Sequence, residues 1–181
     1  PVSWNWEGEK MKNIALIGFM GTGKTAIGRR VAGLLGMEFC DTDQEVERIS
    51  DMSVARVFKK YGKIRFRSEE TLALKRLLTR ANRVISTGGG IVLKPENNAL
   101  LLGQTFVVAL TASVDVICSR VGRGDNRPLL KGGKVREKVV QLLEERRGCY
   151  DFAHFTVDTS YKSPAQVAEQ IAAAYMKYIN C

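Results

Sequence analysis

Residues near the start of the chain have the types and spacing that bind nucleotide phosphates. Residues 18–25 read GFMGTGKT, which matches the phosphate-loop pattern G-x-x-x-x-G-K-[ST]. The glycines let the backbone approach phosphates closely with its N–H groups pointing inward. Lys24 would bring a positive charge to the β- and γ-phosphates, and Thr25 would offer a hydroxyl group to Mg²⁺. We therefore predict that this segment binds a nucleotide phosphate.

Two aspartates follow the next apolar segment. Asp41 and Asp43 come directly after a predicted strand at 37–40. In an extended segment, residues i and i+2 lie on the same face, so both carboxylates can point into one site. One could hold the water ligands of Mg²⁺ while the other accepts a proton from a substrate hydroxyl group. The alternative is that they only cap the helix that follows.

Two later segments stand at predicted element boundaries. Residues 66–70 read FRSEE at the start of a helix, and residues 86–90 read STGGG after a strand. Glycines at a strand end expose backbone N–H groups to a ligand at close range. The alternatives are an Arg67–Glu70 pair at i, i+3 on an ordinary helix and a flexible glycine turn.

Arginines mark two more segments. Arg127 lies in a long loop at 122–134 that is rich in glycine. Such a loop could act as a lid that closes on the phosphates, excludes water and stabilises transition-state charge. The alternative is a disordered surface loop with an incidental arginine. Arg146, four residues before Tyr150, lies near the end of a predicted helix. Its ordinary role there would be to complement the helix dipole.

The apolar patterns between these motifs predict a single α/β domain. Strands are expected at 13–17, 37–40, 83–87, 105–110 and 154–158. Helices are expected at 24–35, 44–50, 53–61, 66–82, 95–102, 113–121, 135–148 and 164–179. Strands that alternate with helices predict a parallel sheet covered by helices on both faces. Gly36 should end the first helix, and Ser163 with Pro164 should begin the last.

Composition limits the remaining possibilities. The chain has 181 residues, of which 45% are hydrophobic, enough for one domain with a sizeable core. The net charge of +9 suits small anionic substrates as well as nucleic acid, but no basic stretch is interleaved with aromatic residues as in proteins that stack bases. Four widely separated cysteines fit reduced thiols of a cytoplasmic protein, and one histidine excludes a histidine-based triad. Residues 1–10 are expected to be an added remnant or a short extension, with the domain at 11–181.

The motifs also narrow the class of phosphate-loop protein. A GTPase would carry D-x-x-G and N-K-x-D elements, and neither occurs in the chain. A nucleotide kinase is harder to exclude from the loop alone. Taken together and in order, the segments resemble shikimate kinase over residues 13–180. The shared elements are GFMGTGKT, DTD at 41–43, FRxxE at 66–70, GGG at 88–90, RPLL at 127–130 and RxxxY at 146–150.

The resemblance implies a P-loop kinase fold with a five-stranded parallel sheet, similar to nucleoside monophosphate kinases, and a role for each matched residue. ATP would be bound by Gly21, Thr22, Gly23, Lys24, Thr25, Ala26, Arg120, Arg127 and Lys162. Shikimate would be bound by Asp43, Arg67, Gly88, Gly89, Gly90 and Arg146. The catalytic residues would be Lys24, Asp43 and Arg127. Mg²⁺ would be held by Thr25, by Asp41 through water and by Ser86 in the outer shell.

The implied reaction is transfer of the ATP γ-phosphoryl group to shikimate, giving shikimate 3-phosphate and ADP, a step of chorismate and aromatic amino acid biosynthesis. The segment at 42–70 would bind the acceptor, and the enzyme would be a cytoplasmic monomer that binds neither nucleic acid nor membrane. Lys63 stands where the family usually has Glu, which could alter pairing at the rim of that segment. The alternatives are a gluconate kinase, a nucleotide kinase and a non-catalytic ATP-binding protein.

Overall fold

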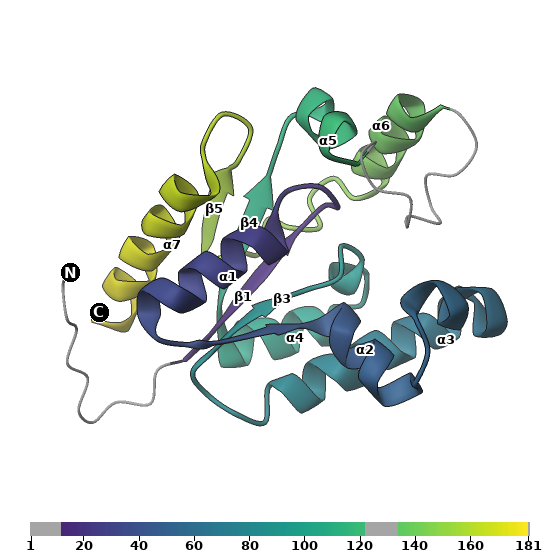
Figure 1. Ribbon diagram of the computed structural model, residues 1–181, viewed down its shortest axis with the longest axis horizontal. Coiled ribbons are helices and arrows are strands. Elements are labelled where there is room, and N and C mark those ends of the chain that lie inside the picture. Colours follow the sequence, from purple (N-terminus) through teal and green to yellow (C-terminus); the bar gives the residue numbers. More distant parts are fainter. Residues whose placement is uncertain (1–11, 122–133, 181) are drawn as a thin grey trace.

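The computed structural model describes residues 12–121 and 134–180, and these residues form the predicted five-stranded parallel sheet with helices on both faces (Figure 1). The strands are β1 (Asn13–Gly18), β2 (Glu38–Asp41), β3 (Arg83–Ser86), β4 (Thr105–Thr111) and β5 (Phe155–Asp158), in the spatial order β2-β3-β1-β4-β5. The helices are α1 (Lys24–Leu35), α2 (Thr42–Ser50), α3 (Val54–Leu77), α4 (Pro95–Gln104), α5 (Val114–Val121), α6 (Val135–Glu145) and α7 (Pro164–Ile179), with a 3₁₀ turn η1 (Ile91–Leu93).

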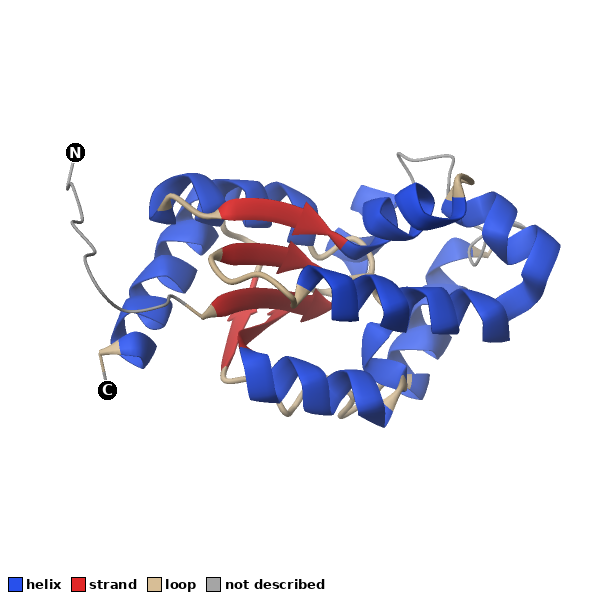
Figure 2. Cartoon of the chain, turned by 90° about the horizontal axis from the view of Figure 1, so that it is seen from below, coloured by secondary structure: helices blue, strands red, loops and turns tan. Residues whose placement is uncertain are grey.

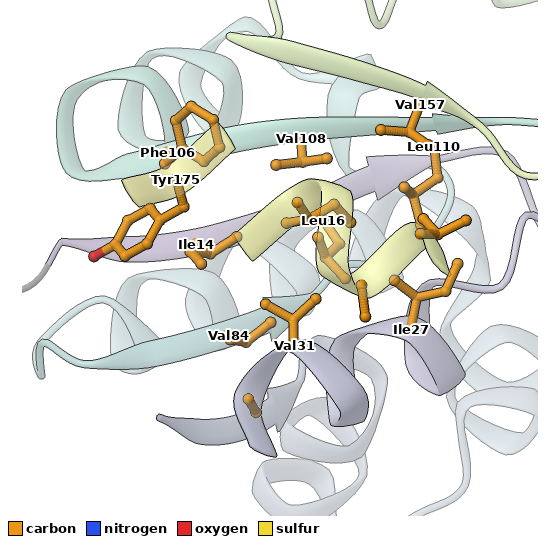
Figure 3. Close-up of a cluster of buried hydrophobic side chains, with 14 of the residues drawn as sticks. Ile14, Leu16, Ile27, Val31, Val84, Phe106, Val108, Leu110, Val157 and Tyr175 are labelled. Atoms are coloured by element: carbon orange, nitrogen blue, oxygen red, sulfur yellow. The ribbon is translucent and has the colours of Figure 1, made fainter. Parts of the chain in front are cut away.

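Strand β1 is buried on both faces because helices cover both sides of the sheet. Its even-numbered residues, such as Leu16, pack with α1 and α7, as Figure 3 shows for Ile27, Val31 and Tyr175. Its odd-numbered residues pack with α3, α4 and η1. This alternation is the period-2 pattern of a strand, and a run apolar at every position is what a central parallel strand requires.

The strand order determines where a ligand can bind. The neighbours of β1 are β3 on one side and β4 on the other, and every pair is parallel. All five strands therefore end at the same edge, and Figure 2 shows helices gathered beyond the arrowheads of the strands. In Figure 1, α5 and α6 lie on one side of this edge and α2 and α3 on the other. Open α/β sheets bind ligands at this edge.

The helix ends follow the local signals in the sequence. Gly36 ends α1 with φ 65°, the left-handed conformation that glycine adopts without steric cost. Ser163 and Gln166 form a capping box at the start of α7, with Pro164 in its first turn. Both predicted boundaries are confirmed.

Other boundaries differ from the prediction. The two helices predicted at 53–61 and 66–82 are both present and together form α3, where Gly62 (φ 74°, ψ 179°) makes a kink between them. α3 ends at Leu77 and α6 ends at Glu145, so the predicted ends at 82 and 148 were wrong. The reason is the same in both cases: the residues that follow form turns, which the helical pattern in the sequence did not separate from the helix.

Some predictions fall outside the described residues. The extension at 1–10 and, apart from Lys134, the lid at 122–134 with its Arg127 are among them. Within the described ranges, no helix is long and apolar enough to cross a bilayer. The described cysteines, Cys40, Cys118 and Cys149, are free thiols.

The single histidine, His154, makes the free energy of unfolding depend on pH. The backbone N–H of His154 donates to the Val107 carbonyl oxygen, and the backbone N–H of Val107 donates to the ring atom Nδ1 of His154, each at 2.9 Å. The second bond requires a neutral imidazole. Partial burial lowers the pKa of His154, and Lys12 lowers it further. The unfolded chain therefore takes up a proton more readily, and stability is lost as the pH falls below about 6.5.

We expect His154→Gln to weaken this dependence, because an amide oxygen can accept the Val107 N–H bond and does not titrate. Urea denaturation between about pH 7.5 and about pH 5 measures the effect. The wild type should lose more of its free energy of unfolding across this range than the variant. Equal losses would show that the imidazole does not couple to folding.

Candidate active site

A cavity of about 850 Å³ opens at the edge where the strands end. It is lined by the phosphate loop, the ends of β2 and β3, the glycine segment 88–90, side chains of α3 between Val54 and Glu70, Arg120 and Arg146. Residues from each motif that the structure describes thus meet in one place. Its size suits a small-molecule ligand.

The phosphate loop is shaped by its glycines and by the lysine that crosses it. Gly21 and Gly23 adopt left-handed conformations, with φ of 80° and 94°. Lys24 Nζ donates to the carbonyl oxygens of Gly18 and Phe19 at 2.8 and 3.0 Å, which holds the ammonium group over the loop. α1 begins at Lys24, so its N-terminal N–H groups and its dipole face the cavity. Positive charge and backbone donors therefore converge where an anion would lie.

Three oxygen-bearing side chains meet beside the loop. Thr25 Oγ1 donates to Asp41 Oδ2 at 3.2 Å and lies 3.5 Å from Ser86 Oγ. Strand register produces the meeting, because Asp41 of β2 and Ser86 of β3 are paired neighbours. Hydroxyl and carboxylate oxygens are the ligand type that Mg²⁺ prefers, with water and phosphate oxygens completing the shell. Within the described ranges, no group of three or more His, Cys, Asp and Glu side chains could hold a metal by itself.

Asp43 projects into the same cavity from the first turn of α2. Burial, together with the nearby Asp41 carboxylate, raises the pKa of its carboxyl group to about 6, while Lys24 opposes the shift. Its Oδ1 atom is buried and has no hydrogen-bond partner among the described residues. Asp41 caps α2 by accepting from the Asp43 N–H at 2.9 Å, so the predicted cap is present together with the predicted shared site.

Arg67 and Glu70 form an ion pair on α3 that faces the cavity. The pairing expected of an ordinary helix is therefore present, but the pair is not on the surface, since only 1% of Glu70 is exposed. Burial raises the pKa of the Glu70 carboxyl group to about 7, and Arg67 opposes the shift. The Arg67 guanidinium group packs against Gly90, where an added Cβ would lie 2.2–2.4 Å from its atoms.

Arg146 reaches the glycine segment from the opposite side. It is the residue directly after the end of α6, only 5% of it is exposed, and its Nη1 donates to the Gly89 carbonyl oxygen at 2.8 Å. The Tyr150 hydroxyl group donates to the same oxygen at 3.1 Å. The guanidinium group also lies 5.2 Å from the centre of the Phe19 ring, within cation–π range. Two arginines far apart in sequence thus lie beside consecutive glycines, Gly89 and Gly90.

Of the two remaining described residues that were predicted to bind the nucleotide, one lines the cavity and the other does not. Arg120 lines the cavity and donates to the Gly21 carbonyl oxygen at 3.2 Å and to Thr159. Lys162 is exposed in the loop after β5 and donates to Gln170 at 3.0 Å. It does not line the cavity. The structure therefore brings Arg120 to the phosphate loop and does not bring Lys162 there.

Sequence reasoning gave no role to several residues of the site. Val54, Phe58 and Phe66 form an apolar wall of the cavity, with the two rings 5.0 Å apart. Tyr150 was seen only as part of a motif, and Glu70 only as part of a motif and as a helix partner of Arg67. A buried acid four residues after Phe66 was a usable signal, because an acid on the buried side of a helix needs a partner. The apolar wall could not be distinguished from ordinary core residues by pattern.

Comparisons with known proteins point to one family. The sequence model of the family described as shikimate kinase matches residues 20–176. A shikimate kinase from Pelotomaculum thermopropionicum is 55% identical over 161 residues, which cover 89% of this chain and 94% of that one. A shikimate kinase from Thermodesulfovibrio yellowstonii is 41% identical over 94% of this chain and 98% of the relative.

Solved structures give the same result for the fold. The shikimate kinase from Acinetobacter baumannii, determined in complex with shikimate, has a TM-score of 0.89 and 36% identity, covering 94% of this chain and 96% of that one. A gluconokinase from Sinorhizobium meliloti has a TM-score of 0.61 at 17% identity, covering 94% of this chain and 95% of that one. The second likeness concerns the fold alone.

The contact between Gly90 and Arg67 gives a structural test. Gly90→Ala should displace the guanidinium group from Glu70 and cost about 1–3 kcal/mol of unfolding free energy, as overpacking does. Gly33→Ala is the matched control, because an added Cβ at that position in α1 meets nothing within 4 Å. It should stabilise the protein by about 0.5–1 kcal/mol. Urea denaturation and crystal structures of both variants decide; an unmoved Arg67 in Gly90→Ala would contradict the packing described.

Proposed function

Because this chain belongs to the shikimate kinase family, we propose that it transfers the γ-phosphoryl group of ATP to a hydroxyl group of shikimate. The products are shikimate 3-phosphate and ADP. The observation that carries the proposal for this chain is the convergence of Arg67 and Arg146 on one glycine segment, beside Asp43 and within the cavity that contains the phosphate loop.

The two arginines suit an acceptor that bears a carboxylate. A planar guanidinium group can donate two parallel hydrogen bonds to a carboxylate, and such charge-assisted bonds are stronger than neutral ones. Glu70 holds Arg67, and the Gly89 carbonyl oxygen holds Arg146, so both donors are oriented before a ligand arrives. Gly88, Gly89 and Gly90 would then contact the ring hydroxyl groups through their backbone.

The phosphate loop supports the ATP side of the proposal. The backbone from Gly21 to Ala26 would cradle the phosphates, and Lys24 would stabilise the negative charge of the transferring phosphoryl group. Arg120 would lie beside the nucleotide, next to Gly21. Roles for Arg127 and Lys162 in ATP binding remain predictions.

Mg²⁺ fits the oxygen cluster next to the loop. Thr25 would be its direct protein ligand, Asp41 would bind it through water, and Ser86 would support both from the outer shell. When bound with ATP, the ion neutralises charge on the β- and γ-phosphates. The protein's own contribution is to hold these three side chains together: strand register pairs Asp41 with Ser86, and Thr25 lies beside them in the first turn of α1. The apolar wall lines the same cavity.

Asp43 is the residue suited to receive the proton of the attacking hydroxyl group. Its unpaired Oδ1 atom is available for a hydrogen bond from the acceptor. A weak base suffices because the transition state of phosphoryl transfer is loose and the proton leaves late. Most of the catalysis would come from positioning and from neutralising charge. We further propose that the enzyme acts in the cytoplasm as a monomer and binds neither nucleic acid nor membrane.

The substrate assignment is tested by removing either side of the proposed carboxylate contact. Wild type should release ADP readily with shikimate and poorly with its methyl ester, gluconate or nucleoside monophosphates. Arg67→Lys and Arg146→Lys should each cost roughly 2–5 kcal/mol in kcat/KM for shikimate, because a point charge cannot replace the fork, and should spare the KM for ATP. The two losses should be non-additive, since both arginines bind one anion.

Arg147→Lys is the matched control, because Arg147 pairs with Glu144 on the surface next to Arg146. It should leave both KM values unchanged. If wild type used acid and ester equally well, the arginines would not bind a carboxylate and the substrate assignment would fail with them.

The role of Asp43 has a separate test. Asp43→Asn keeps the shape of the side chain and removes the base, so turnover should fall by roughly 10²–10⁴-fold. ATP binding, measured by calorimetry, should change little, since the phosphate loop is untouched. Turnover within a few fold of wild type would mean that Asp43 serves only the first turn of α2.

A further inference from the structure

Thr42, the residue between the two aspartates, makes a contact that local structure does not explain. It is the first residue of α2, and none of its surface is exposed. Its Oγ1 accepts a hydrogen bond of 2.8 Å from the backbone N–H of Gly88, 46 residues away in sequence. A threonine at a helix start usually bonds within its own turn. Here its hydroxyl group connects two separate segments of the site.

This bond takes the place of a backbone hydrogen bond between β3 and β2, whose pairing ends before Gly88. β3 ends at Ser86, which pairs with Asp41 of β2, and the next N–H, that of Thr87, donates to Leu16 of β1 at 3.1 Å. The following N–H, that of Gly88, lies beyond the last pair of residues that joins β3 to β2. Because the chain turns into α2 at Thr42, no strand carbonyl group faces it. The Thr42 side chain supplies the acceptor that a buried backbone donor requires.

The position of Gly88 in turn limits the space around the reacting groups. An added Cβ at Gly88 would lie 2.8 Å from Asp43 Oδ1 and 2.6 Å from Glu70 Oε1. The Gly88 backbone therefore packs directly against both carboxyl groups. The next two residues of the segment contact Arg146 and Arg67. A shift of Gly88 would change the distance between Asp43 and everything that is expected to hold the acceptor.

Each residue of the segment 41–43 thus has its own connection. Asp41 bonds Thr25 of the phosphate loop, Thr42 bonds Gly88, and Asp43 projects into the cavity. We infer that Thr42 is a positioning residue whose hydroxyl group fixes the glycine segment relative to Asp43, and so aligns the acceptor hydroxyl group with its base. The inference rests on the proposed function for the identity of the acceptor.

Thr42→Val tests the inference, because valine keeps the shape of threonine and removes the hydrogen-bond acceptor. We expect kcat/KM for shikimate to fall by roughly 10–100-fold, since a misplacement of about 1 Å can cost that much, with the loss shared between kcat and the shikimate KM. The KM for ATP should stay within about twofold. Thr42→Ser restores the hydroxyl group and should return kcat/KM to within about threefold of wild type.

Thr105→Val is the matched control. The Thr105 hydroxyl group is also buried, donates to the Leu101 carbonyl oxygen at 2.7 Å, and lies at the start of β4, at the opposite end of the sheet. Its loss should lower the melting temperature and leave both KM values unchanged. A purely structural role for Thr42 would give the same pattern in Thr42→Val, with lowered stability and unchanged kinetics, and would overturn the inference. Failure of the serine variant to recover activity would overturn it as well.

Hydrogen exchange of the wild-type protein provides an independent test in case Thr42→Val does not fold. The Gly88 amide should exchange slowly although it lies outside regular secondary structure, and rapid exchange would overturn the inference. The outcomes are distinguishable from failure of the proposed function. If wild type phosphorylated another acceptor instead of shikimate, the substrate assignment would fail, and the Thr42 variants would then be compared on that acceptor.

Discussion

The register of three neighbouring parallel strands is the constraint on which the site depends. Asp41, Ser86 and Leu16 lie at the same level of β2, β3 and β1. This level sets the positions of the loops that follow, so the phosphate loop, the segment 41–43 and the glycine segment all leave the sheet together. A slip of one residue would turn each side chain to the opposite face and separate Asp41 from Thr25. Because the two faces of β1 pack against different helices, such a slip would also break the side-chain contacts on both sides of the sheet.

The buried acids of the cavity, Asp43 and Glu70, interact electrostatically with Arg67. Glu70 and Asp43 both have raised pKa values because the site removes them from water, and Arg67 opposes the shift in each case. An acid buried without a cation would be destabilising. Arg67 therefore offsets the cost of burying these acids, and its proposed role in binding the acceptor is additional to this one. The apolar wall, which includes Phe58 and Phe66, strengthens these interactions because apolar side chains lower the local dielectric constant.

The sequence was sufficient for features encoded locally. The phosphate loop, the positions of all five strands and the ends of α1 and α7 could be predicted because each depends on neighbours in the chain. The strand order, the placement of η1 and the contact between Thr42 and Gly88 depend on residues far apart, and no local pattern encodes them. The end of α3 was predicted too late because the residues after Leu77 keep helical periodicity although they form turns. The meeting of Arg67 and Arg146 came only from resemblance to a family, since each has an ordinary local explanation.

The central claim is that one acceptor carboxylate lies between Arg67 and Arg146 while a hydroxyl group of the same molecule faces Asp43. A crystal structure of the protein with ADP, Mg²⁺ and shikimate tests it most directly. We expect carboxylate oxygens within about 2.7–2.9 Å of both guanidinium groups and a ring hydroxyl group within about 2.6–3.2 Å of Asp43. A carboxylate bound away from either arginine, or a hydroxyl group out of reach of Asp43, would contradict the account.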